Sequence, residues 1–161
     1  MTLPKQSDVI PSEADWGDSK DQDVAYAKKM LLGRSNAEMR LELKEMFLPR
    51  YQDVYWMPAV PFHYYMVGLT DFLMAEDNAF DDDRDQVSAC YMDAVERRLS
   101  DDVPAIVPIV DVVLTGLAFI RRNVAKIEWD PEFYGTADDV SKRIDNIVDQ
   151  IHHLPKRPTN G

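Results

Sequence analysis

The chain has 161 residues, of which 45% are hydrophobic and 29% charged, and its net charge is −11. This length suits one globular domain, and such a chain buries enough apolar surface to need no disulfide or structural metal. The excess of acids opposes binding to nucleic acids and anionic membranes, because both depend on Lys and Arg. The charge instead favours a basic protein as partner.

Two features of the sequence predict a soluble cytoplasmic protein. Cys90 is the single cysteine, and the polar start of the chain lacks the apolar segment of a signal peptide. Val103 to Ile120 is largely apolar, but it contains Asp111 and is shorter than the ~20 residues of a typical membrane-spanning helix. We therefore interpret this stretch as a core helix.

Residues 1–19 are expected to form a mobile or loosely packed lead-in, in which Trp16 is the one strong candidate for an anchor to the core. A helical domain is expected over residues 20–154 and a tail over 155–161. The first helix of this domain repeats apolar residues three and four positions apart and ends at Gly33, a residue type that often terminates helices.

A second helix is expected to begin at Ser35. Ser35 and Glu38 match the capping box, in which two side chains satisfy free backbone N–H groups. Pro49 is expected to end this helix or to lie just beyond it, and residues 51–59 to form a less regular connection.

Pro58 and Pro61 are expected to bracket the start of a third helix, with Pro61 in its first turn and with apolar residues on most of its sides. Gly68 lies inside this helix at a cost of about 1 kcal/mol relative to Ala, which close approach by a neighbouring helix would offset. After an acidic connector, the apolar spacing from Val87 to Leu99 predicts a fourth helix.

Residues 104–127 form the fifth segment, in which Pro108 predicts a kink or a later helix start. Its β-branched residues leave a strand possible over 104–113, although its length favours a helix. Residues 129–135 are expected to form a loop, and Thr136 to cap a last amphipathic helix. The sequence therefore predicts an all-α protein, a compact single-domain bundle of about six helices with antiparallel neighbours.

Motifs for catalysis or cofactor binding are absent from the sequence, which has no Gly-rich phosphate loop, CxxC, HExxH or GxSxG. His63, Asp71 and Asp111 are the candidates for an enzyme site that such motifs do not reveal. We expect no cofactor.

Metal binding is also not expected. Asp81, Asp83 and Asp85 match the first three ligand positions of an EF-hand loop, but Gln86 replaces the required Gly and Met92 the final Glu. Residues 152–153 are adjacent histidines, which do not share a helix face and make poor joint ligands. Cys90 has no basic neighbour in the sequence and is expected to be a buried, inert thiol.

The region from Tyr51 to Asp102 is the strongest candidate for an interaction surface. It is rich in aromatic residues, and residues 71–102 contain eleven acids and three bases. Aromatic anchors beside a charged rim are typical of protein interfaces, although the aromatic residues can equally belong to the core. The candidate partner-binding residues are Tyr51, Tyr55, Trp56, Asp81, Asp82, Asp83 and Asp85.

These features favour a non-enzymatic acidic protein that occupies a basic partner protein. A bacterial immunity protein or an antitoxin-like toxin inhibitor would fit, because an acidic face can block a basic, phosphate-binding active site. A structural or adaptor subunit of a phage or secretion-system assembly is the first alternative. An enzyme with a site around His63, Asp71 and Asp111 is the second.

Overall fold

The computed structural model describes residues 9–75 and 83–155. All regular structure in these ranges is helical, which confirms the predicted all-α class, and seven helices have ten or more residues, slightly more than the six expected. The long helices are α2 (Gln22–Leu31), α3 (Asn36–Glu45), α4 (Phe47–Trp56), α5 (Ala59–Met74), α6 (Arg84–Asp101), α8 (Val110–Asn123) and α10 (Ala137–His152). The shorter elements are α1 (Glu13–Trp16), α7 (Val103–Ile106), the 3₁₀ turn η3 (Val107–Ile109) and α9 (Pro131–Tyr134).

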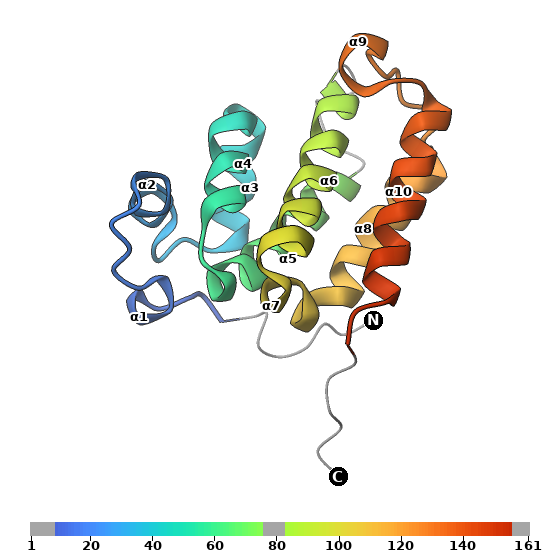
Figure 1. Cartoon of the computed structure of the whole chain (residues 1–161). Helices are drawn as coiled ribbons and strands as arrows, with labels where there is room; N and C mark the ends of the chain where they lie inside the picture. The colour runs from blue at the N-terminus through green and yellow to red at the C-terminus, as the bar shows by residue number, and fades with distance from the viewer. Residues whose placement is uncertain (1–8, 76–82, 156–161) are drawn as a thin grey trace.

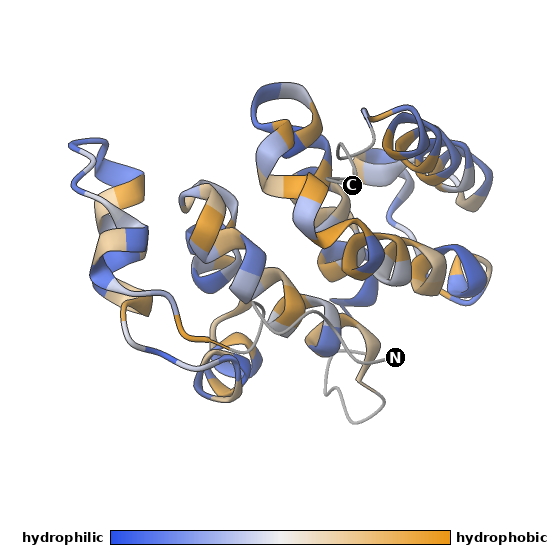
Figure 2. Ribbon diagram, turned by 90° about the horizontal axis from the view of Figure 1, so that it is seen from below, coloured by the Kyte–Doolittle hydropathy of each residue, from blue (hydrophilic) through white to orange (hydrophobic). Residues whose placement is uncertain are grey.

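The helices lie across the molecule roughly in chain order, with α5 and α6 in the middle (Figure 1). α2 packs against α4 and α3 against α5, while α8 packs against both α5 and α10. Apolar and polar residues occupy different sides of several long helices (Figure 2), as expected of amphipathic helices that share one core. Phe62, Tyr65 and Leu69 place α5 at the centre of this core, since all three side chains are fully buried.

Local capping signals position the helix starts as predicted. Ser35 and Glu38 form a capping box at the start of α3, and Thr136 and Asp139 form one at the start of α10. Gly33 follows α2 with a φ of 77°, a backbone conformation that favours glycine.

The prediction for residues 47–59 is wrong. Pro49 does not end a helix; it is the third residue of α4, which continues through most of the segment expected to be less regular. Proline is tolerated there because backbone N–H groups in the first turn have no partner within the helix. The backbone leaves the helical conformation at Met46 instead, with φ −142° and ψ 68°, and this residue separates α3 from α4.

Gly68 of α5 shows the close helix approach that the sequence predicted. A Cβ atom at this position would lie 2.3 Å from Oδ1 of Asn36, the first residue of α3. The Asn36 side chain also donates a hydrogen bond of 3.0 Å to the carbonyl of Tyr64. Glycine therefore lets α3 and α5 pack closely.

The apolar stretch after α6 is helical, so the strand alternative is wrong. Pro108 lies within η3, which separates α7 from the start of α8 at Val110, so the helix is interrupted where the proline predicted a kink or a later start. In the parts of the chain described above, residues Val103–Asn123 alone are long and apolar enough to cross a membrane. Core helices of folded proteins meet the same criterion, and 44% of the apolar stretch within these residues is buried inside the fold.

Two short helices lie in segments for which the sequence predicted none. α1 lies within the first 19 residues, and its Trp16 is buried against Tyr65 with ring centroids 6.1 Å apart. α9 occupies part of the predicted loop 129–135, with Pro131 as its first residue and Asp130 as its N-cap.

Candidate binding groove between α4, α6 and α10

An open groove with a volume of about 710 Å³ runs between α4, α6 and α10. α6 contributes the largest share of its lining, and α4 contributes one wall. The lining residues are Tyr51, Gln52, Tyr55, Trp56, Asp93, Glu96, Arg97, Ser100, Asp101, Arg143 and Gln150.

The wall formed by α4 is aromatic. Tyr51 and Tyr55 have ring centroids 6.0 Å apart, and Tyr55 meets Trp56 edge to face at 4.9 Å. Tyr51 is mostly buried at 7% exposure, whereas Trp56 is 36% exposed and accessible to a ligand. The three aromatic residues predicted as partner-binding therefore line one groove.

Arg143 of α10 joins two acidic residues of α6 across the groove. Its guanidinium donates hydrogen bonds of 2.6 Å to Glu96 and 2.5 Å to Asp93. Burial of the arginine opposes its charged form, but the bonds to the two carboxylates outweigh burial and raise the pKa of Arg143. Asp101, the last residue of α6, is exposed at the groove and makes no ion pair within the described residues.

Arg97 connects α6 to the aromatic wall. Its Cζ atom lies 4.8 Å from the ring centroid of Tyr55 and 4.5 Å from that of Trp56, within the range of cation–π attraction. The Arg97 guanidinium also donates a hydrogen bond to the carbonyl of Tyr55. The groove thus presents three carboxylates and two guanidinium groups beside three aromatic rings.

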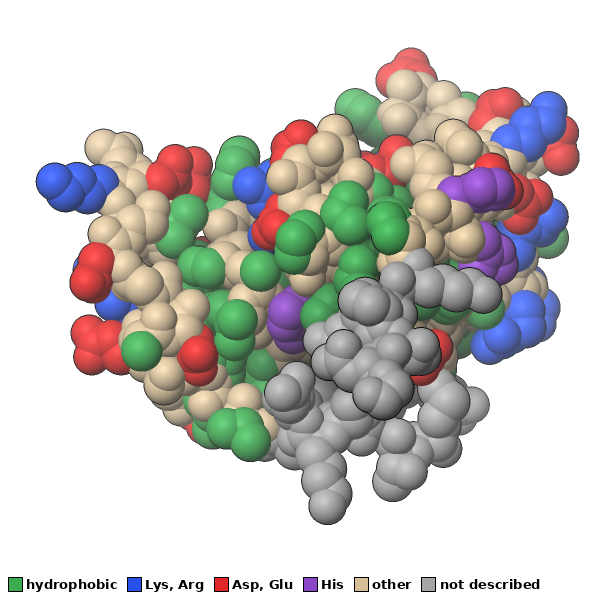
Figure 3. Space-filling model, turned by 60° about the horizontal axis from the view of Figure 1, so that its bottom comes forward, with side chains coloured by type: hydrophobic (Ala, Val, Ile, Leu, Met, Phe, Trp, Pro, Cys, Tyr) green, Lys and Arg blue, Asp and Glu red, His purple; other side chains and the backbone are tan. Residues whose placement is uncertain are grey.

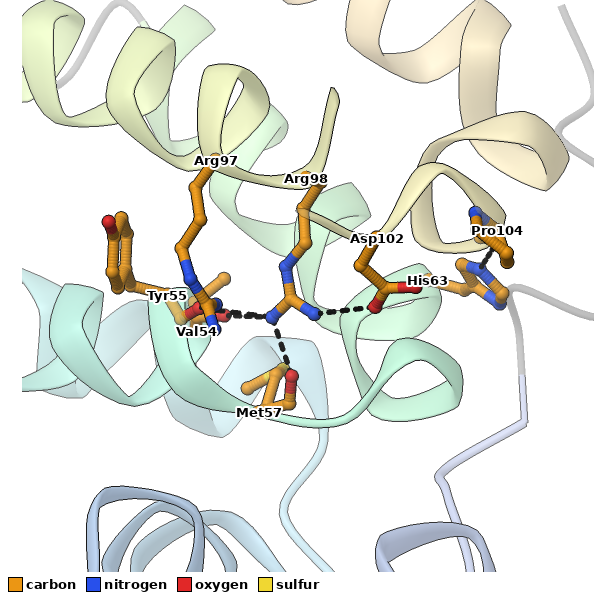
Figure 4. Close-up of polar contacts among 8 residues, drawn as sticks. All are labelled: Val54, Tyr55, Met57, His63, Arg97, Arg98, Asp102 and Pro104. Atoms are coloured by element: carbon orange, nitrogen blue, oxygen red, sulfur yellow. Dashed lines mark hydrogen bonds and ion pairs between the residues drawn. The ribbon is translucent and has the colours of Figure 1, made fainter. Parts of the chain in front are cut away.

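Beneath this wall, the buried Arg98 holds the end of α4 (Figure 4). It donates hydrogen bonds of 3.0 Å to the carbonyl of Tyr55, 2.5 Å to that of Met57 and 3.1 Å to the Asp102 carboxylate. Burial lowers the pKa of Arg98 to about 10, so the guanidinium stays charged at neutral pH.

None of the four acidic residues that were predicted to bind a partner is among the described residues that line the groove. Asp81 and Asp82 fall outside the described residues. Asp83 and Asp85 lie at the start of α6 and do not line the groove. Asp85 accepts a hydrogen bond of 3.3 Å from the backbone N–H of Asp130, at the far end of α6 from Asp101. On the face shown in Figure 3, hydrophobic side chains are frequent near the middle, and acidic side chains lie both among them and at the edges.

The three candidate residues for an enzyme site, His63, Asp71 and Asp111, each contact different parts of the protein. His63 and Asp71 are eight residues apart on α5, a rise of about 12 Å along the helix. His63 Nε2 lies 3.1 Å from the carbonyl of Pro104, and burial lowers the pKa of His63. Burial raises the pKa of Asp71, and the charge that opposes this rise belongs to Arg40 of α3. Asp111 is exposed on α8.

Cys90 is not a reactive thiol in this fold. Cys90 is buried on α6, and burial followed by the nearby Asp93 raises the pKa of its thiol to about 12. Such a thiol remains protonated and unreactive at neutral pH. The described residues hold no cluster of three His, Cys, Asp or Glu side chains that could bind a metal ion.

Sequence reasoning missed the polar part of the groove. Asp93 lies three positions before Glu96 and four before Arg97, and Arg97 lies four before Asp101, which is the spacing of neighbours on one helix face. That spacing was a usable signal. Arg143 was not accessible in this way, because it follows Glu96 by 47 residues and meets it only in the fold.

No protein-family model matches this chain, and neither the curated proteins nor the solved structures contain a match to it.

Proposed function

We propose that the protein is a non-enzymatic binding protein that occupies a basic partner protein through the groove between α4, α6 and α10. The groove itself carries the proposal, because the aromatic wall formed by Tyr51, Tyr55 and Trp56 borders carboxylates in an opening of about 710 Å³. Aromatic side chains with a polar rim are the usual composition of protein interfaces.

The charge of the molecule supports a basic partner. The chain carries a net charge of −11, so it attracts a basic surface over a distance and increases the rate of encounter. Asp101 is free to pair with an incoming Lys or Arg. Asp93 and Glu96 are already paired with Arg143, so Asp101 is the groove carboxylate that is available to a cation of the partner.

An inhibitor of a toxin is the class of binding protein that these features fit best. A toxin that acts on phosphate-containing substrates has a basic active site, and a compact acidic protein blocks such a site by competing with the substrate's charge. The protein would then act in the bacterial cytoplasm as an immunity protein or an antitoxin.

The test is a charge reversal at the groove. The tagged protein is used to isolate its partner from the cells that produce it, and the wild type is compared with Asp101→Lys. We expect this change to weaken partner binding by roughly tenfold, since a favourable charge contact becomes repulsive. Glu45→Lys is the matched control, because Glu45 is an exposed C-terminal helix residue outside the groove.

The expected complex is soluble, has a 1:1 stoichiometry in size-exclusion chromatography with light scattering, and weakens as salt is added. Equal affinity of the wild type and Asp101→Lys for the purified partner would contradict the groove assignment. Recovery of the protein only as part of a large particle would instead support the adaptor alternative.

A further inference from the structure

Phe133 of α9 is the most exposed large hydrophobic side chain among the described residues, at 76% exposure. α9 stands at one end of the molecule, beyond α6 and α10 (Figure 1). Isolated apolar residues on a surface are common and need no explanation. Two observations set Phe133 apart. Hydrogen bonds and aromatic contacts hold α9 in place, and the segment that carries Phe133 is acidic.

Hydrogen bonds hold α9 to the ends of two long helices. The indole of Trp129 donates a hydrogen bond of 2.9 Å to the carbonyl of Val124, directly after α8. The backbone N–H of Asp130 donates one of 3.3 Å to Asp85 near the start of α6. The Asp130 side chain in turn accepts a hydrogen bond of 3.0 Å from the N–H of Glu132, which caps α9.

Aromatic packing supports the same segment. Tyr134 lies between its two aromatic neighbours, with its ring centroid 6.1 Å from that of Trp129 and 6.2 Å from that of Phe133. These contacts fix the backbone from which Phe133 projects, which lowers the entropy cost of ordering this segment on binding.

The segment that carries Phe133 is acidic, and Lys142 of α10 pairs with one of its acids, Asp138, at 3.6 Å. Residues 128–139 contain five acids and no base. All five acids are exposed: Glu128, Asp130, Glu132, Asp138 and Asp139. A second copy of the chain placed on this end would bring like charges together, and an anionic membrane would also be repelled. A positively charged protein surface is the complementary partner.

We propose that Phe133 is the anchor residue of a second protein-binding surface, and that it inserts into an apolar pocket rimmed by Lys or Arg on a partner protein. An apolar anchor within a charged rim is the arrangement that gives binding energy and specificity together. This surface lies on α9 and is separate from the groove. The proposal shares with the proposed function only the expectation that the partner is basic.

The proposal is tested with a defined probe, a helical peptide of Lys and Leu with one apolar and one basic face. Its affinity is measured by calorimetry, and its position by NMR shifts of the labelled protein. We expect the strongest shifts around α9 and at least about fivefold weaker binding to Phe133→Ala, because the ring loses its apolar contact. Because the Phe133 side chain is 76% exposed, we expect Phe133→Ala to keep the wild-type fold.

Two controls separate this effect from general attraction. Leu41→Ala removes another highly exposed apolar side chain, 66% exposed on α3, and should leave the affinity unchanged. A peptide in which Ser replaces Leu should bind at least about fivefold more weakly than the Lys and Leu peptide, since it keeps only the charge.

Equal losses in Leu41→Ala and Phe133→Ala would overturn the proposal, as would equal binding of the two peptides. A wild-type dimer that Phe133→Ala converts to a monomer would also overturn it, since the occupant would then be a second copy. Asp101→Lys distinguishes the two surfaces: if it abolishes peptide binding while Phe133→Ala does not, the groove remains supported and the Phe133 surface is rejected.

Discussion

Arg98 shows how one buried residue positions the groove. Its side chain is 3% exposed, and its guanidinium reaches the carbonyls of Tyr55 and Met57 as well as the Asp102 carboxylate. The last carbonyl groups of an α-helix have no partner within the helix, so a buried helix end needs external donors. Arg98 supplies them at the end of α4, where Tyr55 and Trp56 form the aromatic wall.

Replacing Arg98 with Met should destabilise the protein by about 2–4 kcal/mol, because the change keeps the apolar stem but leaves buried carbonyls and a carboxylate without their donor. Unfolding in urea measures this loss as a lower midpoint. Arg122→Met, at an exposed position on α8, should unfold at nearly the wild-type midpoint. A stable Arg98→Met variant would show that the end of α4 does not depend on this cation.

At the scale of elements, the helix starts were predictable because their signals are local. The capping boxes at α3 and α10 each involve residues three positions apart, so the chemistry is complete within one turn. α4 was not predictable in the same way. Pro49 is compatible with a helix end or a first turn, and the bonds that hold α4 come from Arg98, which lies 43 residues beyond Tyr55.

The groove, too, was predictable only where its residues lie close together in the sequence. Its aromatic wall was predicted because Tyr51, Tyr55 and Trp56 lie close together in the sequence. Its ionic part depends on Arg143, which is 50 residues from Asp93 and approaches it only when α10 packs against α6. Charge density alone selected acids near the start of α6, where Asp83 and Asp85 do not line the groove, while Asp81 and Asp82 lie outside the described residues.

The capping box of α10 should make a measurable contribution, since this helix presents Arg143 to the groove. Thr136 accepts a hydrogen bond of 3.2 Å from the N–H of Asp139, and Thr136→Ala removes it. We expect a loss of about 1 kcal/mol and faster amide exchange in the first turn of α10. Thr115→Ala is the matched control, because Thr115 is exposed and bonds only a carbonyl within its own helix. A loss of the same size in the control would argue against a capping effect.

The stability of the whole molecule is expected to depend on pH through a buried ion pair on α4, outside the groove. Asp53 is 3% exposed, and its Oδ2 lies 3.3 Å from Nε of Arg50. Neither of these two atoms has a hydrogen-bond partner, and Oε2 of Glu42 is also buried without one. Burial raises the pKa of Asp53 to about 6, although Arg50 opposes the shift, and Glu42 adds to it.

This shift predicts that Asp53 makes the fold less stable as the pH rises. The folded state binds the proton more tightly than the unfolded chain, in which the pKa is near 3.8, so the stabilising contribution is complete below about pH 4 and is lost through about pH 6. Burial lowers the pKa of His63, which acts in the opposite direction. The informative quantity is therefore the difference in unfolding free energy between the wild type and Asp53→Asn, because the His63 contribution cancels.

That difference should change by about 1–3 kcal/mol between pH 4 and pH 7, with the wild type losing stability relative to Asp53→Asn as the pH increases. Urea unfolding at a series of pH values measures it. Asp145→Asn provides the comparison, because Asp145 is an exposed partner of Arg121 and not a buried carboxylate. A constant difference between the wild type and Asp53→Asn would mean that Arg50 holds Asp53 ionised throughout. The buried pair would then stabilise α4 equally at every pH in this range.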